Sequence, residues 1–194
     1  REIIKILIAL TTELRPYTPL LLSYHGFLTK LDFVRAKALF AIDIQASMPK
    51  LLKEPKTKLM NARHPLLLLS FAKEQKLVVP LNIQLNENVR VVLVSGPNAG
   101  GKSVCMKTVG LLQMMLQTGL LVPVDENSEM GIFDQIFADI GDDQSIESDL
   151  STYSAHLTKM RYFVAHATPK TLVLIDEFGT GTDPQFGGPM AEAV

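Results

Sequence analysis

The sequence has very little cysteine and no long apolar run. Its 194 residues contain one cysteine, Cys105, and no tryptophan. A single cysteine excludes an internal disulfide framework, and the chain has neither a Cys-x-x-Cys pair nor a Cys/His cluster to hold zinc. This cysteine usage fits a reducing, cytoplasmic setting. No stretch of about 18 apolar residues occurs, so no membrane-spanning helix is predicted.

Charge is nearly balanced overall but is unevenly distributed. The formal net charge is -1. Residues 1–60 contain ten Lys and Arg against five Asp and Glu, whereas residues 61–194 contain nine against fifteen. Phosphate contacts are made by clustered Lys and Arg, so the acidic second part argues against a broad nucleic-acid footprint there. The basic residues of the first part are interpreted as a solvated helix face.

The first part of the chain is predicted to be helical. Apolar residues recur at helical spacing over residues 1–14 and again over 20–46, with Pro16 and Pro19 interrupting the pattern between them. Residues 50–58 are predicted to be a polar linker. The chain has no initiating methionine and stops in mid-pattern, which suggests a piece of a longer protein.

Beyond the linker the pattern changes to strands alternating with helices, which predicts an α/β domain. We therefore divide the chain into a helical segment with its linker, 1–58, and an α/β domain, 59–194. A helix over residues 101–117 is expected to stop at Gly119. The strands are predicted at residues 57–62, 78–85, 90–96 and 171–177, with shorter ones near Val122, Ile132 and Ile136.

A glycine-rich stretch, GPNAGGKS, lies between the strand at 90–96 and the next helix and matches the phosphate-loop pattern G-x-x-x-x-G-K-[ST]. Glycines let backbone N–H groups turn toward phosphates, and the helix N-terminus adds its positive dipole end. Lys102 would neutralise the β and γ phosphates, and the Ser103 hydroxyl would bind Mg²⁺. The predicted phosphate-binding residues are Gly96, Pro97, Asn98, Ala99, Gly100, Gly101, Lys102 and Ser103.

Two carboxylates end the apolar strand TLVLIDE, at the edge of an α/β sheet where ligands bind. Asp176 is placed to hold Mg²⁺, and Glu177 to activate the attacking water as the catalytic base. The chain has no N-K-x-D element for guanine recognition, and an acid that activates water marks a hydrolase. ATP hydrolysis coupled to motion is the class that remains.

Four segments together resemble the ATPase domain of the MutS family, and in particular its bacterial paralogue branch, the MutS-two subfamily. They are ARHPLL, GPNAGGKS, FDQIFADIGDDQSIESDLSTYSAHL and VLIDEFGTGTDP. The resemblance covers residues 60–194, and the helices before residue 50 are similar to the family's lever region. It implies a phosphate-loop NTPase of the ABC-type class with a helical segment at its N-terminus.

The resemblance also implies a composite site. Two subunits of a homodimer would sandwich ATP and Mg²⁺, with Ser151 and Thr152 reaching the partner's γ-phosphate from a helix that either residue could cap. Residues 179–184 would let the two sites sense each other, and Asp139 and Gln144 would belong to a loop that couples nucleotide state to the rest of the protein.

Several features depart from the family's pattern. Val78 occupies the adenine-side position that is aromatic in mismatch-repair MutS, so stacking there must be weaker. The family's switch histidine would lie beyond Val194, and the chain alone is expected to bind ATP better than it hydrolyses it. His64, His156 and His166 are interpreted as packing or surface residues, and Cys105 as a small buried hydrophobe.

The leading function is the ATPase module of a MutS-two protein that acts on branched DNA, suppressing recombination, or on stalled collided ribosomes. Nucleic acid would be bound by other parts of the protein, and any nuclease activity would lie outside this stretch. The alternative is a mismatch-repair MutS that recognises mispaired DNA. A transporter or chromosome-clamp ATPase would carry L-S-G-G-Q where this chain has DLSTYS. A folded but inactive nucleotide-binding module is a fourth possibility.

Overall fold

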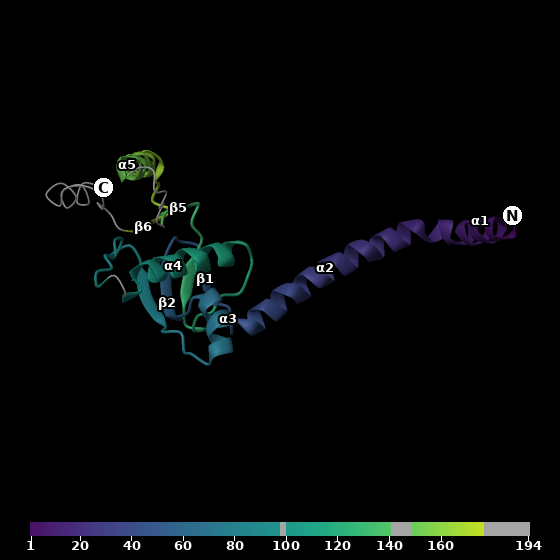
Figure 1. Cartoon of the computed structure of the whole chain (residues 1–194), viewed down its shortest axis with the longest axis horizontal. Helices are drawn as coiled ribbons and strands as arrows, with labels where there is room; N and C mark the ends of the chain where they lie inside the picture. The colour runs from purple at the N-terminus through teal and green to yellow at the C-terminus, as the bar shows by residue number, and fades with distance from the viewer. Residues whose placement is uncertain (98–99, 141–148, 177–194) are drawn as a thin grey trace. The chain divides into compact units, whose positions relative to one another are not determined.

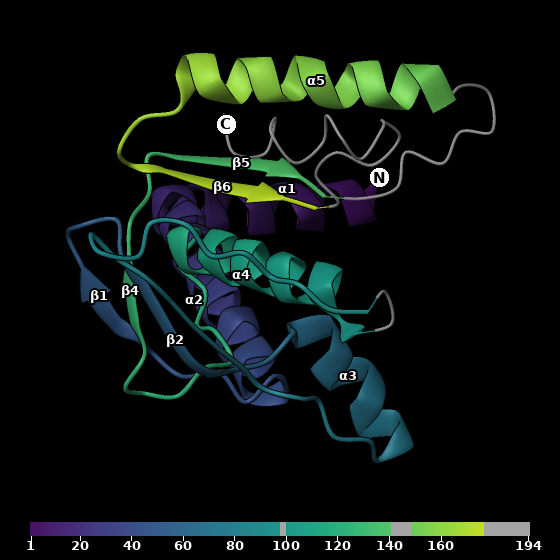
Figure 2. The same ribbon diagram turned by 90° about the vertical axis from the view of Figure 1, so that its left-hand side faces the viewer.

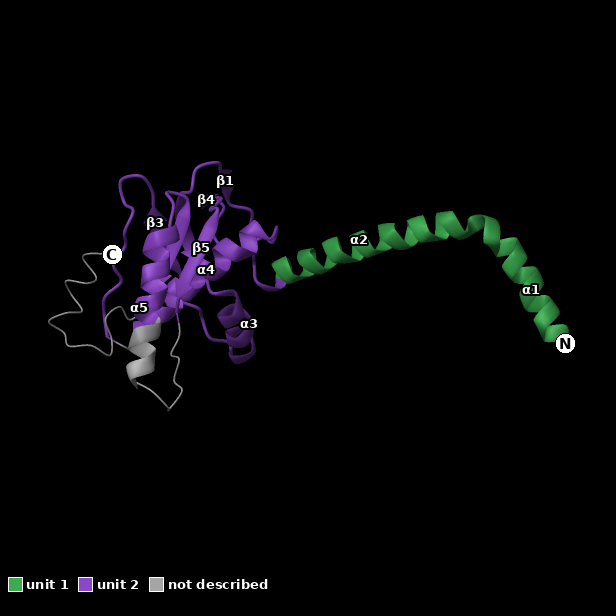
Figure 3. Cartoon of the chain, turned by 90° about the horizontal axis from the view of Figure 1, so that it is seen from above, with its two compact units in different colours: residues 1–42 green, residues 43–194 purple. Residues whose placement is uncertain are grey.

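The computed structural model describes residues 1–97, 100–140 and 149–176, with residues 149–155 described by their backbone alone. The chain forms two compact units, residues 1–42 and residues 43–194, each of which is considered by itself (Figure 3). Among the residues that the structure describes, no helix is both long and apolar enough to cross a lipid bilayer.

The first unit is helical along its length. Helix α1 (Glu2–Leu14) passes through a 3-10 turn, η1 (Arg15–Tyr17), into helix α2 (Thr18–Asp43) (Figure 1). The predicted interruption is confirmed, because Pro16 lies in the 3-10 turn, where its missing N–H costs no helical hydrogen bond. Helix α2 begins and ends slightly earlier than its sequence pattern indicates.

The second unit begins with a four-stranded mixed sheet in the order β1-β4-β2-β3. Strand β2 (Thr57–Ala62) matches its prediction, and β3 (Leu81–Leu85) lies within its predicted range. Strands β1 (Lys50–Leu52) and β4 (Glu129–Gly131) run parallel to each other, while β2 is antiparallel to both β3 and β4. Ile132 follows β4, and Val122 makes an isolated bridge to Ser47.

The predicted polar linker over residues 50–58 is wrong. Its first three residues form β1, and β2 begins at Thr57. Strand β1 is stabilised by pairing with residues almost eighty positions later, including a 2.8 Å bond from the Lys50 N–H to the Ser128 carbonyl. A local composition of lysine and proline cannot reveal such a partner, because strand pairing depends on distant residues.

Two helices, α3 (Pro65–Glu74) and α4 (Lys102–Gln117), also belong to this unit. Helix α3 was not predicted from the sequence, although Pro65 stands at its first position, where proline is favoured. Helix α4 is confirmed with its stop signal, since Gly119 has φ +77° just beyond the helix end. Leu112, on α4, has no exposed surface.

A second, parallel two-stranded sheet pairs β5 (Gln135–Asp139) with β6 (Thr171–Ile175). Figure 2 shows α5 (Asp149–His166) on one face of this pair and α4 on the other. On the α5 face, the Phe137 and Phe163 rings stack at 5.1 Å. On the α4 face, Gly110 approaches Leu174 so closely that a Cβ there would lie 2.6 Å from the leucine side chain. This three-layer arrangement is a mixed α/β fold.

The predicted buried strand at residues 90–96 is not a strand in this structure. Val91 and Leu93 are 85% and 90% exposed, and within the described residues no strand pairs with this segment. The apolar run indicates a preference for burial, but a strand also needs hydrogen-bonding neighbours, and the sequence pattern does not supply these.

Candidate functional site

The phosphate-loop segment leads directly into helix α4. Gly96 has φ +152°, and the Gly100 N–H donates to the Pro97 carbonyl at 2.9 Å, which forms a tight turn. Gly101, at φ +82°, caps α4 in a left-handed conformation that side chains rarely adopt, so glycine is required there. Asn98 and Ala99 lie outside the described residues.

Lys102 is the first residue of α4, and its side chain turns back over the loop. Its ammonium Nζ donates to the Gly96 carbonyl at 2.6 Å. The helix starts without a side-chain cap, and its first backbone hydrogen bond runs from Cys105 N–H to Gly101 carbonyl at 2.9 Å. Ser103, the next residue, is partly buried. The loop therefore presents an ammonium group, a hydroxyl and a helix N-terminus together, a combination that suits an anion.

Asp176 follows β6 directly and is held through its backbone. Its N–H donates to the carbonyl oxygen of Asp139, the last residue of β5, at 2.8 Å. Both aspartates thus stand at the carboxyl ends of two paired parallel strands, where ligands bind in α/β sheets. Glu177, the predicted base, lies outside the described residues.

The Asp139 side chain forms an ion cluster that sequence reasoning missed. Its carboxylate is 2% exposed, accepts a 2.8 Å bond from Lys159 Nζ, and lies 2.5 Å from His156 Nδ1. Burial opposes ionisation of the carboxyl, but the bonds from Lys159 and His156 outweigh it and lower the pKa of Asp139 below its usual value. His156 was predicted to be a packing or surface residue. Its three-residue spacing from Lys159 on one helix face was the available signal.

The helix that carries Ser151 and Thr152 starts earlier than predicted. Helix α5 begins at Asp149, so both residues lie in its first turn, and the prediction that one of them is the N-cap is wrong. Gln144 and residues 179–184 lie outside the described residues.

The adenine-side candidate, Val78, lies in the irregular segment between α3 and β3. It is partly buried, whereas its neighbours Leu77 and Val79 are exposed.

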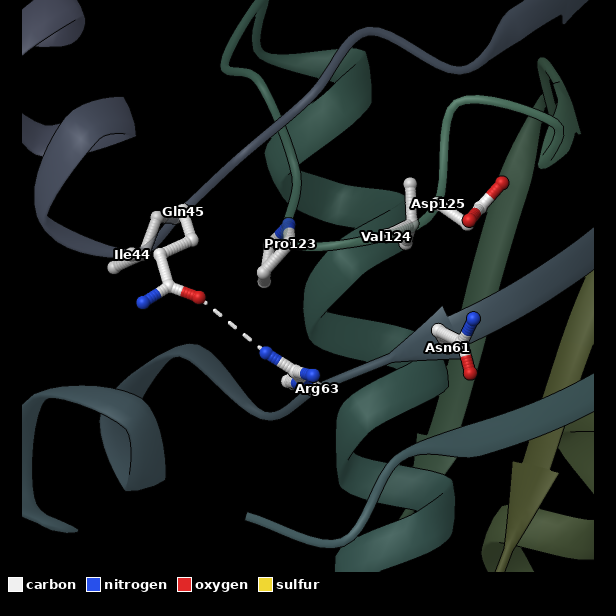
Figure 4. Close-up of a pocket in the computed structure, with 7 residues that line it drawn as sticks. All are labelled: Ile44, Gln45, Asn61, Arg63, Pro123, Val124 and Asp125. Carbon is white, nitrogen blue, oxygen red and sulfur yellow. Dashed lines mark hydrogen bonds between the residues drawn. The ribbon is translucent and has the colours of Figure 1, made fainter. Parts of the chain in front are cut away.

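The described structure has a pocket away from the phosphate loop. Figure 4 shows its lining residues, among which Gln45 accepts a 3.3 Å bond from Arg63 Nη1. Asn61 and Asp125 lie on the other side of the pocket. No residue of the predicted nucleotide site lines it, so this pocket is a separate feature. The full lining is Ile44, Gln45, Asn61, Arg63, Pro123, Val124 and Asp125.

Burial shifts the pKa of two further residues that the sequence singled out, His64 and Cys105. His64 occupies the N-cap position of helix α3, where its side chain makes no capping hydrogen bond. The pKa of His64 is lowered, first by burial and then by the charge of Lys107 on α4. A neutral packing histidine is consistent with its interpretation from the sequence. Burial raises the pKa of the Cys105 thiol, which disfavours the reactive thiolate.

Comparison with known proteins defines the class. The family model of MutS domain V matches residues 92–194, more than half of the chain, and the chain therefore belongs to the MutS family.

The chain is similar to proteins named Endonuclease MutS2, which confirms the resemblance to the MutS-two branch. It is 47% identical over 193 residues to that of Finegoldia magna, covering 100% of this chain and 24% of the relative. For the protein of Lactobacillus acidophilus, the identity is 48% over 167 residues, covering 86% of this chain and 20% of the relative. For the protein of Gemmatimonas aurantiaca, the identity is 43% over 196 residues, covering 100% of this chain and 23% of the relative. The chain thus spans about a quarter of the length of these relatives.

Proposed function

We propose that this chain is the ATP-binding and ATP-hydrolysing module of a MutS-two type protein, with the fold of an ABC-type phosphate-loop NTPase. The observation that carries the proposal is the 2.6 Å bond from Lys102 Nζ to the Gly96 carbonyl. This bond holds the ammonium group against the first glycine of the loop, which supports a phosphate-binding role for Lys102. Membership of the MutS family, whose proteins are ATP-dependent, supports the nucleotide.

In this proposal the chain's residues divide the work of hydrolysis. Lys102 and the loop backbone bind the phosphates, and Ser103 and Asp176 supply two oxygen ligands for Mg²⁺, which commonly keeps several waters and binds phosphate oxygens as well. The metal would offset charge on the phosphates. Glu177 would accept a proton from the attacking water. Val78 would contact the adenine from its segment before β3.

The site would be completed by a second copy of the chain. MutS-family proteins act as dimers, and we propose that Ser151 and Thr152, in the first turn of α5, face the γ-phosphate of the partner's nucleotide. The positive end of a helix dipole suits that anion.

The whole protein is proposed to act on nucleic acid in the cytoplasm, on branched DNA during recombination or on stalled collided ribosomes. The relatives' shared name, Endonuclease MutS2, favours this branch over a mismatch-repair MutS. Nuclease activity would reside outside residues 1–194, in line with the small share of each relative that the chain covers.

The test compares three variants of the whole protein that carries this sequence. Lys102→Ala is expected to weaken ATP binding by about 100-fold or more, because each hydrogen bond to a charged group contributes about 1.5–3 kcal/mol and Lys102 would reach two phosphates. Lys107→Ala, a control on the same helix, should bind ATP normally. Glu177→Gln should bind ATP and fail to turn it over. Affinity is measured by calorimetry and hydrolysis by phosphate release.

Two results would contradict the proposal. Equal ATP affinity in Lys102→Ala and Lys107→Ala would remove the phosphate role of the loop. Hydrolysis at the wild-type rate by Glu177→Gln would remove its assignment as the base. Single-turnover measurements on residues 1–194 beside the whole protein would show whether this segment binds ATP without hydrolysing it.

A further inference from the structure

The Asp139 ion cluster connects two parts of the proposed site. Through its carbonyl oxygen, Asp139 accepts the Asp176 N–H at 2.8 Å, and through its carboxylate it contacts His156 and Lys159 on α5. One residue therefore bonds both the strand end that carries the proposed magnesium ligand and the helix whose first turn carries Ser151 and Thr152.

The cluster contacts the middle of α5, since His156 and Lys159 lie seven and ten residues after its first residue, Asp149. Phe137, two positions before Asp139 on the same face of β5, stacks on Phe163 and contacts Tyr162 near the end of the helix. The Asp139 carboxylate instead contacts His156 and Lys159. His156 is four residues after Thr152, a distance of about 6 Å along a helix axis. The aromatic contacts fix the end of the helix, and the ion cluster fixes its middle, beginning about one turn after Thr152.

We propose that Asp139 is a positioning residue that locks the middle of α5, and through it the helix turn before His156, to the end of β6. The inference rests on the proposed function, and it assigns to this cluster the placement of Ser151 and Thr152 for the partner's nucleotide. The buried carboxylate is well suited to this task. Moving the helix away from the strand would leave this buried carboxylate without its partners His156 and Lys159, at considerable cost, so the contact tolerates little change in the distance between helix and strand.

In this proposal, Asp139 of one chain serves the nucleotide site of the partner chain. This distinguishes its role from simple support of its own fold. Asp139→Asn removes the carboxylate but keeps the backbone carbonyl that holds Asp176. The variant's own phosphate loop and metal ligands therefore stay intact. What changes is the position of the α5 turn that the variant offers to its partner. Misplacement of such a group by about 1 Å can lower a rate 100-fold.

The first measurement is steady-state ATP hydrolysis and ATP affinity of the whole protein. Asp139→Asn is expected to keep its ATP Kd within about twofold and to lower kcat by about 10- to 100-fold, because the lost interaction serves the reacting state rather than binding. The matched control is Asp134→Asn, which changes an exposed aspartate preceding the same strand, 4.0 Å from Lys170. Equal kcat in the two variants would overturn the proposal.

Mixed dimers provide the decisive test. When Asp139→Asn is paired with Lys102→Ala, the competent phosphate loop belongs to the Asp139→Asn chain, while the α5 facing it retains Asp139. Activity should then recover to that of a dimer of wild type with Lys102→Ala. Absence of recovery would mean that Asp139 serves its own chain, which overturns the proposal.

A second mixed dimer tests the composite site of the proposed function separately from the role of Asp139. A mixed dimer of Ser151→Ala with Lys102→Ala should also recover if the site is composite. Recovery there, with none for Asp139→Asn, overturns the Asp139 lock alone, whereas no recovery in either overturns the composite site.

A second variant guards against misfolding of Asp139→Asn. Lys159→Met removes one partner of the Asp139 carboxylate, and the Lys159 side chain itself is 42% exposed. This variant should show a smaller loss of kcat than Asp139→Asn, with the same recovery in trans. A kcat equal to that of Asp134→Asn would count against the lock.

Discussion

The two units of the chain differ in what stabilises them. Residues 1–42 are all described, and among them Ala41 alone is buried, while isoleucines, leucines and phenylalanines along α1 and α2 are exposed. Their described hydrogen bonds are local, such as those from Thr11 and Thr29 to carbonyls four residues earlier. In residues 43–194, by contrast, strands pair across long stretches of sequence around fully buried side chains such as Leu112.

This difference shows where sequence reasoning succeeds. A helix depends on neighbours three and four positions away, so its presence can be predicted from local spacing. Local spacing does not show what packs against the apolar residues of a helix. A helix with apolar side chains around its circumference normally gains its stability from such packing. The second unit depends on close approaches between distant segments, and there a small change at one residue should have a large effect.

The largest contrast is expected at glycines. A Cβ at Gly131 would lie 1.8 Å from the Glu54 carbonyl oxygen, whereas a Cβ at Gly26, within α2, would meet no atom within 4 Å. Gly131→Ala should therefore lower the free energy of unfolding by at least about 3 kcal/mol, because backbone atoms must move. Gly26→Ala should raise helix stability by about 0.5–1 kcal/mol.

Urea unfolding followed by circular dichroism measures both glycine variants. Gly110→Ala provides an intermediate case, since its Cβ would meet only the Leu174 side chain, which can rotate. If Gly26→Ala lowered the free energy of unfolding as much as Gly131→Ala, the comparison would be contradicted, because other atoms would then have to pack against α2 at Gly26.

A smaller contrast is expected for leucines. Leu112→Ala, in α4, should cost about 2–5 kcal/mol, because it leaves a cavity in a buried layer. Leu31→Ala, in α2, should cost less than about 0.5 kcal/mol, because this side chain is 53% exposed. Thermal unfolding of residues 1–194 gives both values. Repeating Leu31→Ala in the whole protein sharpens the comparison, since a larger cost there would locate a packing partner for α2.

The fold could be predicted in part, and the errors have a common cause. Strand β2, helix α4 and the stop at Gly119 were predicted because local signals determine them. The strand β1 was mistaken for a linker, and residues 90–96 for a strand. In both cases the deciding factor is whether a hydrogen-bonding partner lies alongside, and local composition does not contain that information.

The candidate site shows the same division. The turn that leads into α4 was predictable because its glycines and Lys102 lie within one short stretch, and the 2.6 Å contact of Lys102 with Gly96 is such a local feature. Its role in binding phosphate remains a prediction. The cluster of Asp139 with His156 and Lys159 was missed as a cluster, because it joins a strand to a helix seventeen to twenty residues later. The roles of Glu177, Ser151 and Thr152 remain predictions.

The smallest effect is expected from pH, at His64, the N-cap residue of α3. Burial, followed by the charge of Lys107, lowers the pKa of His64 below its ordinary value of 6.5. As pH falls through that ordinary value, the unfolded chain binds a proton before the folded chain does. The free energy of unfolding should therefore decrease as pH falls, until the lowered pKa is reached.

The measurement is urea unfolding at a series of pH values between about 7.5 and 5.5, comparing wild type with His64→Gln. His64→Gln should reduce the slope of stability against pH. Lys107→Met should reduce it by less, because burial is the larger cause of the shift and remains in that variant. Titration of the imidazole by NMR provides an independent value, and a midpoint at or above 6.5 would contradict the shift. Because the charge of Lys107 contributes to the lowered pKa, a neutral His64 avoids repulsion between an imidazolium and the Lys107 ammonium of α4.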